Sequence, residues 1–112
     1  ALAADGVLSD RGGLSDPWQR AGLRLIGIVG DAGRATGRDV GVCGEAGGDP
    51  ALAPVLVGLG ATSLSMTPRS LGRVAAALAA VTEADCRRAA DAALSATSAE
   101  GARAAARAVL GP

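Results

Sequence analysis

Apolar residues recur at helical spacing over most of this chain, and two short strand-like runs interrupt the pattern. The first helical stretch begins at Asp16-Pro17, an N-cap followed by a proline suited to a first helical turn, and it ends near Gly37. Its apolar positions at helical spacing are Trp18, Ala21, Leu25, Ile28, Val29 and Ala32. The pattern predicts one long amphipathic helix here.

Two strands are predicted, over residues 39–43 and 63–66. The helix between them is capped by Asp49, runs over residues 50–57 and is closed by glycines, of which Gly60 is the last. A strand, a helix and a second strand in this order are typical of a parallel sheet. The predicted fold class is therefore α/β.

Three helices are predicted after the second strand. The first covers residues 68–81, with an apolar face of Leu71, Val74, Ala75 and Leu78. Thr82 starts the next helix, with Glu83 and Asp85 in its first turn, where acidic residues suit the helix dipole. The inner face of that helix is predicted to hold Ala89, Ala90, Ala93 and Leu94, and Ser98 starts a last helix over residues 99–110. Residues 1–15 are predicted as a loop, 16–81 as βα units and 82–112 as carboxyl-terminal helices.

Composition narrows the functional classes. The formal net charge is zero and the arginines are spread along the chain, so we expect no nucleic-acid partner. No apolar run approaches the roughly 18 residues that span a bilayer, and we expect no membrane segment and no secretory signal. The two cysteines lie far apart and show neither metal-ligand spacing nor a disulfide framework. Together with the absence of a secretory signal, this favours the reducing cytoplasm. Trp18 is the only aromatic residue, so we expect an isolated domain of marginal stability.

Cys43 is the main candidate for chemistry. It ends the first predicted strand, and parallel α/β folds place their reactive groups at such carboxyl ends. The residue type alone allows a nucleophile, a metal ligand or an acid. A lone cysteine is also often a small buried hydrophobe, and this is our interpretation of Cys86. Four further residues have equally simple structural interpretations: a helix cap for Asp49, a core position for Met66, and a solvated face for Arg103 and Arg107.

Several blocks in a fixed order carry a family resemblance. These are Cys43-Gly44-Glu45, then Gly48-Asp49-Pro50, Gly58-Leu59-Gly60 and Ser63-Leu64-Ser65-Met66-Thr67-Pro68, with Leu2-Ala3-Ala4-Asp5 and Asp16-Pro17-Trp18 before them. In this order they resemble the carboxyl-terminal part of the phosphoenolpyruvate (PEP)-utilising enzymes, and most closely the PEP–protein phosphotransferases, enzyme I of the sugar phosphotransferase system. The resemblance implies the last two βα units of a PEP-binding (β/α)8 TIM barrel plus its carboxyl-terminal helices.

The resemblance also implies a reaction. Members of the family move the phosphoryl group of PEP onto a histidine and leave pyruvate enolate, which must be protonated at carbon 3. Cys43 stands at the position of that proton donor, and a thiol is mostly protonated at neutral pH yet gives its proton up readily. Gly44 lets a small substrate approach the backbone, and Glu45 is expected to orient neighbouring groups. The implied partners are PEP and pyruvate, a histidine phosphocarrier protein and a second copy in a homodimer. Mg²⁺ is the implied cofactor.

Several family residues are absent from these 112 residues. The chain has no histidine, and the magnesium ligands of the family lie on earlier strands, so no metal ligand is assigned. Gly6 stands where the family has an arginine that binds the substrate phosphate, and Arg11 is the candidate replacement. We therefore expect the isolated chain to be inactive.

Two other interpretations stay open. The Gly47-Gly48-Asp49-Pro50 run also resembles the pyruvate phosphate dikinases and PEP synthases. A non-catalytic half-barrel, kept as an interaction or dimerisation module, would fit Gly6, the missing histidine and two strands with unpaired edges.

Overall fold

The structure is a computed structural model that describes residues 16–44 and 46–111. Its elements, in chain order, are α2 (Arg20–Thr36), β1 (Gly41–Val42), α3 (Ala53–Leu59), β2 (Ser63–Leu64), α4 (Pro68–Ala79), α5 (Glu83–Ser95) and α6 (Ala99–Leu110). The predicted succession of helices and strands and the α/β class are confirmed. The loop predicted for residues 1–15 lies outside the described residues.

β1 and β2 form a two-stranded parallel sheet in which Gly41 pairs with Ser63 and Val42 with Leu64. Both strands are shorter than predicted. At the start of β1 the backbone N–H of Val40 donates to the Thr62 hydroxyl (2.8 Å), so a side chain replaces the next ladder bond. At its end the chain turns at Gly44, which has a φ of +81°.

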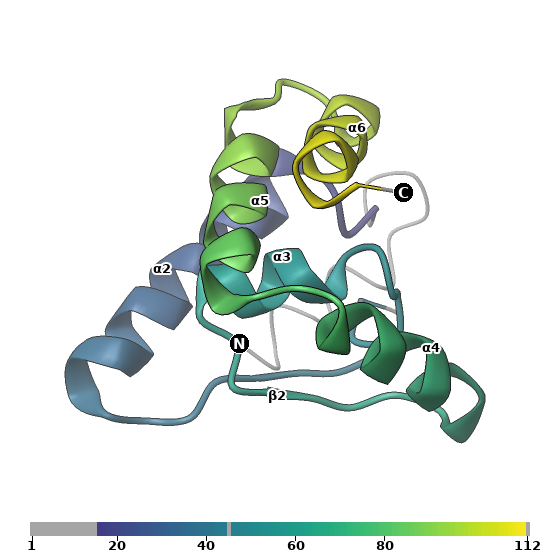
Figure 1. Cartoon of the computed structure of the whole chain (residues 1–112). Helices are drawn as coiled ribbons and strands as arrows, with labels where there is room; N and C mark the ends of the chain where they lie inside the picture. Colours follow the sequence, from purple (N-terminus) through teal and green to yellow (C-terminus); the bar gives the residue numbers. More distant parts are fainter. Residues whose placement is uncertain (1–15, 45, 112) are drawn as a thin grey trace.

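α3 lies between the strands and the α5–α6 pair, with α2 on one flank and α4 on the other (Figure 1). The core is built mainly from small aliphatic side chains, and Trp18 is its one large ring. The largest fully buried side chains are Trp18, Leu23, Leu52, Val55 and Leu56. Because Leu52, Val55 and Leu56 belong to α3 or to its N-cap, this helix is the centre of the domain.

Two neighbouring helices touch α3 backbone to backbone. A Cβ on Gly30 of α2 would lie 1.8 Å from the carbonyl oxygen of Leu59, and a Cβ on Gly58 would lie 2.1 Å from the carbonyl oxygen of Cys86 in α5. Both distances are far below van der Waals contact, so only glycine fits at either position. The helices thereby bury their surfaces without large side chains.

The predicted apolar face of α2 is partly wrong. Leu25 is 42% exposed and Ile28 is 66% exposed, whereas the buried positions are Gly22, Leu23, Ile26, Gly30 and Gly33. The hydrophobic pattern counts apolar side chains, but this helix turns glycines inward. Gly30 lies against the backbone of Leu59 in α3, and Gly33 lies against Val40 and the Arg38 carbonyl oxygen. Gly37 ends the helix in the left-handed conformation, as predicted.

Side chains cap α5 and α6 as predicted, whereas α2 and α3 begin later than expected and have no side-chain cap of their own. Asp16 Oδ1 accepts the Trp18 N–H (2.9 Å), and Asp49 Oδ1 accepts the Ala51 N–H (2.9 Å). Each carboxylate stabilises a turn that precedes its helix, so α2 starts at Arg20 and α3 at Ala53. The start of α5 is a complete capping box between Thr82 and Asp85, and Ser98 caps α6 by accepting the Gly101 N–H (3.0 Å).

The inner face of α5 is confirmed, whereas that of α4 is only partly so. Ala89, Ala90 and Ala93 are buried, and Leu94 packs on the core. On α4 only Val74 is buried; Leu71 is 59% exposed, Ala75 is exposed and Leu78 is half-buried. Within the described part of the chain no element covers this face, which borders a groove of about 260 Å³ beside β2.

No helix among residues 16–44 and 46–111 is both long and apolar enough to cross a membrane.

The contact between Gly30 and α3 predicts opposite effects for two glycine-to-alanine substitutions. Gly30→Ala should lower the free energy of unfolding by more than about 2 kcal/mol, because the added methyl group overlaps the carbonyl group of Leu59. Gly72→Ala, in α4 with open space around the new Cβ, should raise it by about 0.5–1 kcal/mol. Urea unfolding followed by circular dichroism measures both. Equal effects would contradict the described α2–α3 packing.

The capping box predicts an acid-sensitive contribution to stability. The Thr82 backbone N–H and then its hydroxyl, followed by Arg88, hold the pKa of Asp85 below its ordinary value of 3.8. Since the folded-state pKa is the lower one, the contribution is present above about pH 4 and is lost as pH falls through the folded-state pKa. Unfolding measured between about pH 6 and pH 2 should lose this component in Asp85→Asn and only part of it in Thr82→Ala, because alanine at position 82 still donates its backbone N–H to Asp85. An unchanged acid dependence in both variants would show that the box does not form.

Candidate functional site

The candidate site begins where the two strands end. Cys43 follows β1 directly, and Ser65 follows β2. The Ser65 N–H donates to the Val42 carbonyl oxygen (2.9 Å), which holds the two carboxyl ends side by side. The strands therefore present Cys43 and the segment from Ser65 onward at the same edge of the sheet, as predicted for Cys43.

A glycine-rich loop folds across this edge. Gly44 takes a positive φ and turns the chain away from β1. Further along, a Cβ on Gly47 would lie 2.5 Å from the Ser65 carbonyl oxygen and 3.0 Å from that of Val42. Because a side chain would not fit there, the loop backbone rests directly on the ends of both strands. This close packing positions Gly44 and Gly48 next to the residues that follow β2.

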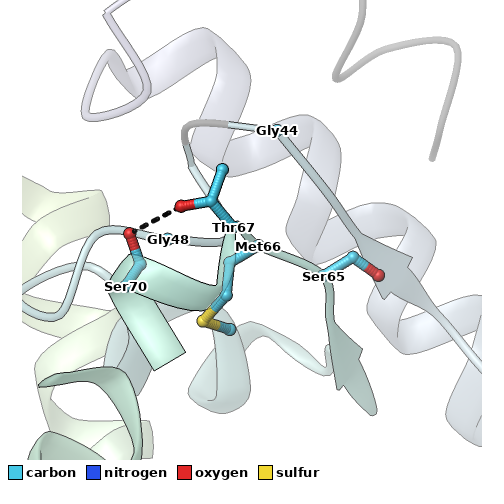
Figure 2. Close-up of a pocket in the computed structure, with 6 residues that line it drawn as sticks. All are labelled: Gly44, Gly48, Ser65, Met66, Thr67 and Ser70. Atoms are coloured by element: carbon cyan, nitrogen blue, oxygen red, sulfur yellow. Dashed lines mark hydrogen bonds between the residues drawn. The ribbon is translucent and has the colours of Figure 1, made fainter. Parts of the chain in front are cut away.

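A cavity of about 540 Å³ opens at this place. It is lined by two glycines of the loop, by the segment after β2 and by the first turn of α4: Gly44, Gly48, Ser65, Met66, Thr67 and Ser70. Figure 2 shows the Thr67 and Ser70 hydroxyls turned toward one another, 3.5 Å apart, with the two glycines contributed by the opposite loop. Since one such contact uses one hydroxyl proton, a second remains available to an occupant of the cavity.

The two cysteines differ in environment. Cys43 is half-buried at the strand end, and the structure records no disulfide for it and, among the described residues, no hydrogen bond to its thiol. Cys86 is buried in α5, where burial first, and then the carboxylates of Asp85 and Glu83, raise the pKa of its thiol. The structural interpretation of Cys86 is confirmed, and Cys43 is the thiol that a small molecule can approach.

Of the other predicted site residues, one lines the cavity and two lie outside the described residues. Gly44 lines the cavity, whereas Glu45 and Arg11 lie outside the described residues. No group of three or more His, Cys, Asp or Glu side chains that could hold a metal ion occurs in the described part of the chain.

Trp18 is hydrogen-bonded to Asp49, the residue that follows Gly48 of the loop. Its indole N–H donates to Asp49 Oδ2 (3.2 Å), while the other oxygen of that carboxylate caps the turn before α3. The guanidinium carbon of Arg103 lies 5.6 Å from the centre of the indole ring. Asp49 therefore caps the turn before α3 and not the helix itself, whose N-cap is Leu52, and it links the loop to the buried tryptophan.

Sequence reasoning missed the hydroxyl groups of the cavity. Ser65 and Thr67 belong to a block that carries the family resemblance but received no role there, Ser70 lies outside that block, and Met66, predicted as a core residue, lines the cavity. The available signal was position, because all four follow a strand that is parallel and adjacent to the strand of Cys43.

Comparison with known families gives one match over most of the chain. Residues 1–83 match the family described as "PEP-utilising enzyme, PEP-binding domain". The match includes both strands, the glycine-rich loop and the cavity residues.

Three curated proteins with similar sequences carry the same name. The chain is 55% identical over 109 residues to the phosphoenolpyruvate-protein phosphotransferase of Streptomyces coelicolor, covering 97% of this chain and 20% of that protein. It is 48% identical over 73 residues to the protein of that name from Borreliella burgdorferi, covering 65% and 13%. With that of Mycoplasma genitalium the identity is 35% over 98 residues, covering 88% and 17%.

The chain thus spans about a fifth or less of the length of these relatives. By its match over residues 1–83, the chain belongs to the family of PEP-utilising enzymes, within the PEP-binding domain.

Proposed function

We propose that this chain supplies the enolate-protonating corner of a PEP–protein phosphotransferase, with Cys43 as the proton donor. The observation that carries the proposal is the position of the half-buried thiol. It stands at the carboxyl end of β1, one residue before the lining of a cavity large enough for a three-carbon phosphoester. The 55% identity to a phosphoenolpyruvate-protein phosphotransferase over 97% of the chain supports it further.

The proposed step is a proton transfer to carbon. PEP gives its phosphoryl group to a histidine outside these 112 residues, and the P–O bond breaks to leave pyruvate enolate. The S–H bond of Cys43 then breaks as a C–H bond forms at carbon 3, which yields pyruvate and a thiolate. Water reprotonates the thiolate before the next turnover. General acid catalysis of this kind typically contributes about 10²–10⁴-fold in rate.

Hydroxyl groups of the cavity would bind and orient the substrate. Thr67 and Ser70 have a hydroxyl proton to donate to a carboxylate or enolate oxygen, and the glycine backbone of the loop leaves room for close approach. Glu45 is proposed to orient neighbouring groups, and Arg11 to replace the phosphate-binding arginine missing at Gly6. Mg²⁺ would be held by residues outside these 112, since the resemblance implies that its ligands lie on earlier strands.

The uncovered surfaces support a larger assembly. The two strands leave their outer edges free among the described residues, and α2 and α4, the helices on the two flanks of α3, carry the exposed Ile28 and Leu71 (Figure 1). Parallel sheets are normally covered by helices on both faces. Their exposed edges are normally paired, covered or removed by closure into a barrel. We propose that β1 and β2 are the last two strands of a (β/α)8 barrel, followed by carboxyl-terminal helices over residues 82–112. In that context the protein would be a cytoplasmic, magnesium-dependent homodimer that phosphorylates a histidine phosphocarrier in sugar uptake.

The same exposed surfaces favour a second candidate, a non-catalytic half-barrel that uses them for association. In that case the Cys43 thiol would have no role in turnover. The dikinase alternative receives less support, since the relatives compared above are named as phosphotransferases.

A chimera tests the proposed step. Residues of this chain would replace the segment of the Streptomyces coelicolor phosphotransferase that they match over 109 residues. With the chimera active, Cys43→Ala should lower PEP turnover by at least about 100-fold, because the enolate loses its acid. The matched control is Cys86→Ala, which changes the other cysteine and should keep turnover within about threefold.

A second measurement separates proton donation from folding. Chiral-methyl analysis of pyruvate, formed in isotopic water from PEP labelled at carbon 3, should show protonation on one face with Cys43 and on both faces in Cys43→Ala. If Cys43→Ala keeps both rate and facial selectivity, the thiol is not the proton donor. A chimera that folds but is inactive with Cys43 intact would favour the non-catalytic half-barrel.

A further inference from the structure

A second cavity lies beside Trp18, away from the candidate site. It measures about 340 Å³ and is bounded by the segment before and in α3, by the end of α4 and by α6. Its walls are mainly apolar: Trp18, Pro50, Ala51, Pro54, Ala77, Ala80, Val81, Leu110 and Gly111. We call this cavity the Trp18 groove. The volume lies within the range of small-molecule sites in proteins, about 300–1,000 Å³.

Two cationic groups complete the lining. Arg103 and Arg107 stand one helical turn apart on α6, and both are exposed. Other arginines, namely Arg34, Arg87 and Arg88, form ion pairs with nearby carboxylates. The described structure records no ion pair for either groove arginine. The groove therefore combines a largely apolar body with two positive charges that no described carboxylate neutralises.

Trp18 is fully buried although it borders the groove. The guanidinium carbon of Arg103 lies over the indole ring, 5.6 Å from its centre. A guanidinium group that lies over an aromatic ring directs its N–H groups parallel to the ring plane. A carboxylate or phosphate can then accept hydrogen bonds from two of these N–H groups. The indole ring thus positions the guanidinium group of Arg103 so that it can bind an anion.

We propose that the Trp18 groove binds a small organic anion, a carboxylate or phosphate ester with an apolar body. The anionic end would accept hydrogen bonds from Arg103 and Arg107, and the apolar end would contact the proline, alanine and leucine walls. A small anion suits the groove better than a polypeptide, because the cationic end holds two guanidinium groups within one helical turn and the volume of about 340 Å³ is that of a small-molecule site.

The occupant would lie against the loop of the candidate site. Pro50 and Ala51 line the groove directly after Asp49, which binds the indole N–H, and Gly48 just before it lines the cavity near Cys43. An anion bound to Arg103 over the indole ring therefore changes the surroundings of the Trp18–Asp49 hydrogen bond. The groove is independent of the proposed proton transfer, since it shares no lining residue with that cavity.

The single tryptophan makes the binding test direct. The chain has one indole N–H, so its ¹H–¹⁵N NMR signal is a single reporter at the wall of the groove, and the arginine variants below assign a shift to the groove. Titration of the full 112-residue chain with benzoate should shift this signal to saturation. Inorganic phosphate, which lacks an apolar body, and benzyl alcohol, which lacks a charge, should each bind at least about tenfold more weakly.

Variants locate the binding. Arg103→Gln and Arg107→Gln should each weaken benzoate binding by at least about fivefold, and the double variant more. The matched control is Arg73→Gln on α4, another exposed arginine that lies outside the groove lining and should bind as the unchanged chain does. Arg107→Gln leaves the contact with Trp18 intact, so its effect is not one of folding.

Three results would overturn the proposal. One is the absence of a saturable shift with benzoate, and another is equal weakening by Arg73→Gln and Arg107→Gln. The third is a shift caused by an acidic peptide such as acetyl-Asp-Leu-Asp-amide but not by benzoate, which would assign the groove to a protein partner. None of these outcomes depends on catalysis by Cys43.

Discussion

Backbone contact at α3 is the constraint on which this small domain depends. The carbonyl group of Leu59 lies against Gly30, and that of Cys86 lies against Gly58, so three helices meet where no side chain intervenes. A chain with one aromatic residue has little bulk with which to fill larger spaces between helices. Close approach allows the alanines of α5 and α6 to bury their small surfaces in the core.

The same helix sets the geometry of the candidate site. The turn before α3 is capped by Asp49, and the indole of the buried Trp18 binds the same carboxylate. The glycine-rich loop is thus fixed at its far end by α3 and at its near end by β1. Between these points Gly47 rests on the ends of both strands. The position of Cys43 beside the cavity follows from these three restraints.

Local signals made much of this architecture predictable. The order of the elements followed from such signals. Thr82 and Ser98 indicated the starts of α5 and α6, Gly37 indicated the end of α2, and the valines at 40 and 42 indicated the strand before Cys43. The inward face of α2 was not predictable from apolar periodicity, because its contacts require the absence of side chains at Gly30 and Gly33.

For the site, the sequence indicated Cys43 and Gly44 through their position after a strand. The hydroxyl-lined cavity and the Trp18–Asp49 bond depend on residues far apart along the chain, and only folding brings these together. The exposed face of α4 was likewise unpredictable, since the apolar pattern indicates that a surface is to be covered but not which element covers it.

The most direct test of the central claim is a crystal structure of the phosphotransferase chimera with oxalate, a planar mimic of pyruvate enolate. Oxalate bound in the cavity of Ser65, Thr67 and Ser70, with the Cys43 Sγ about 3–4 Å from the atom that corresponds to carbon 3, is the result that proton donation by Cys43 requires. Oxalate bound elsewhere, or a Cys43 thiol turned away from it into the core, would contradict the assignment.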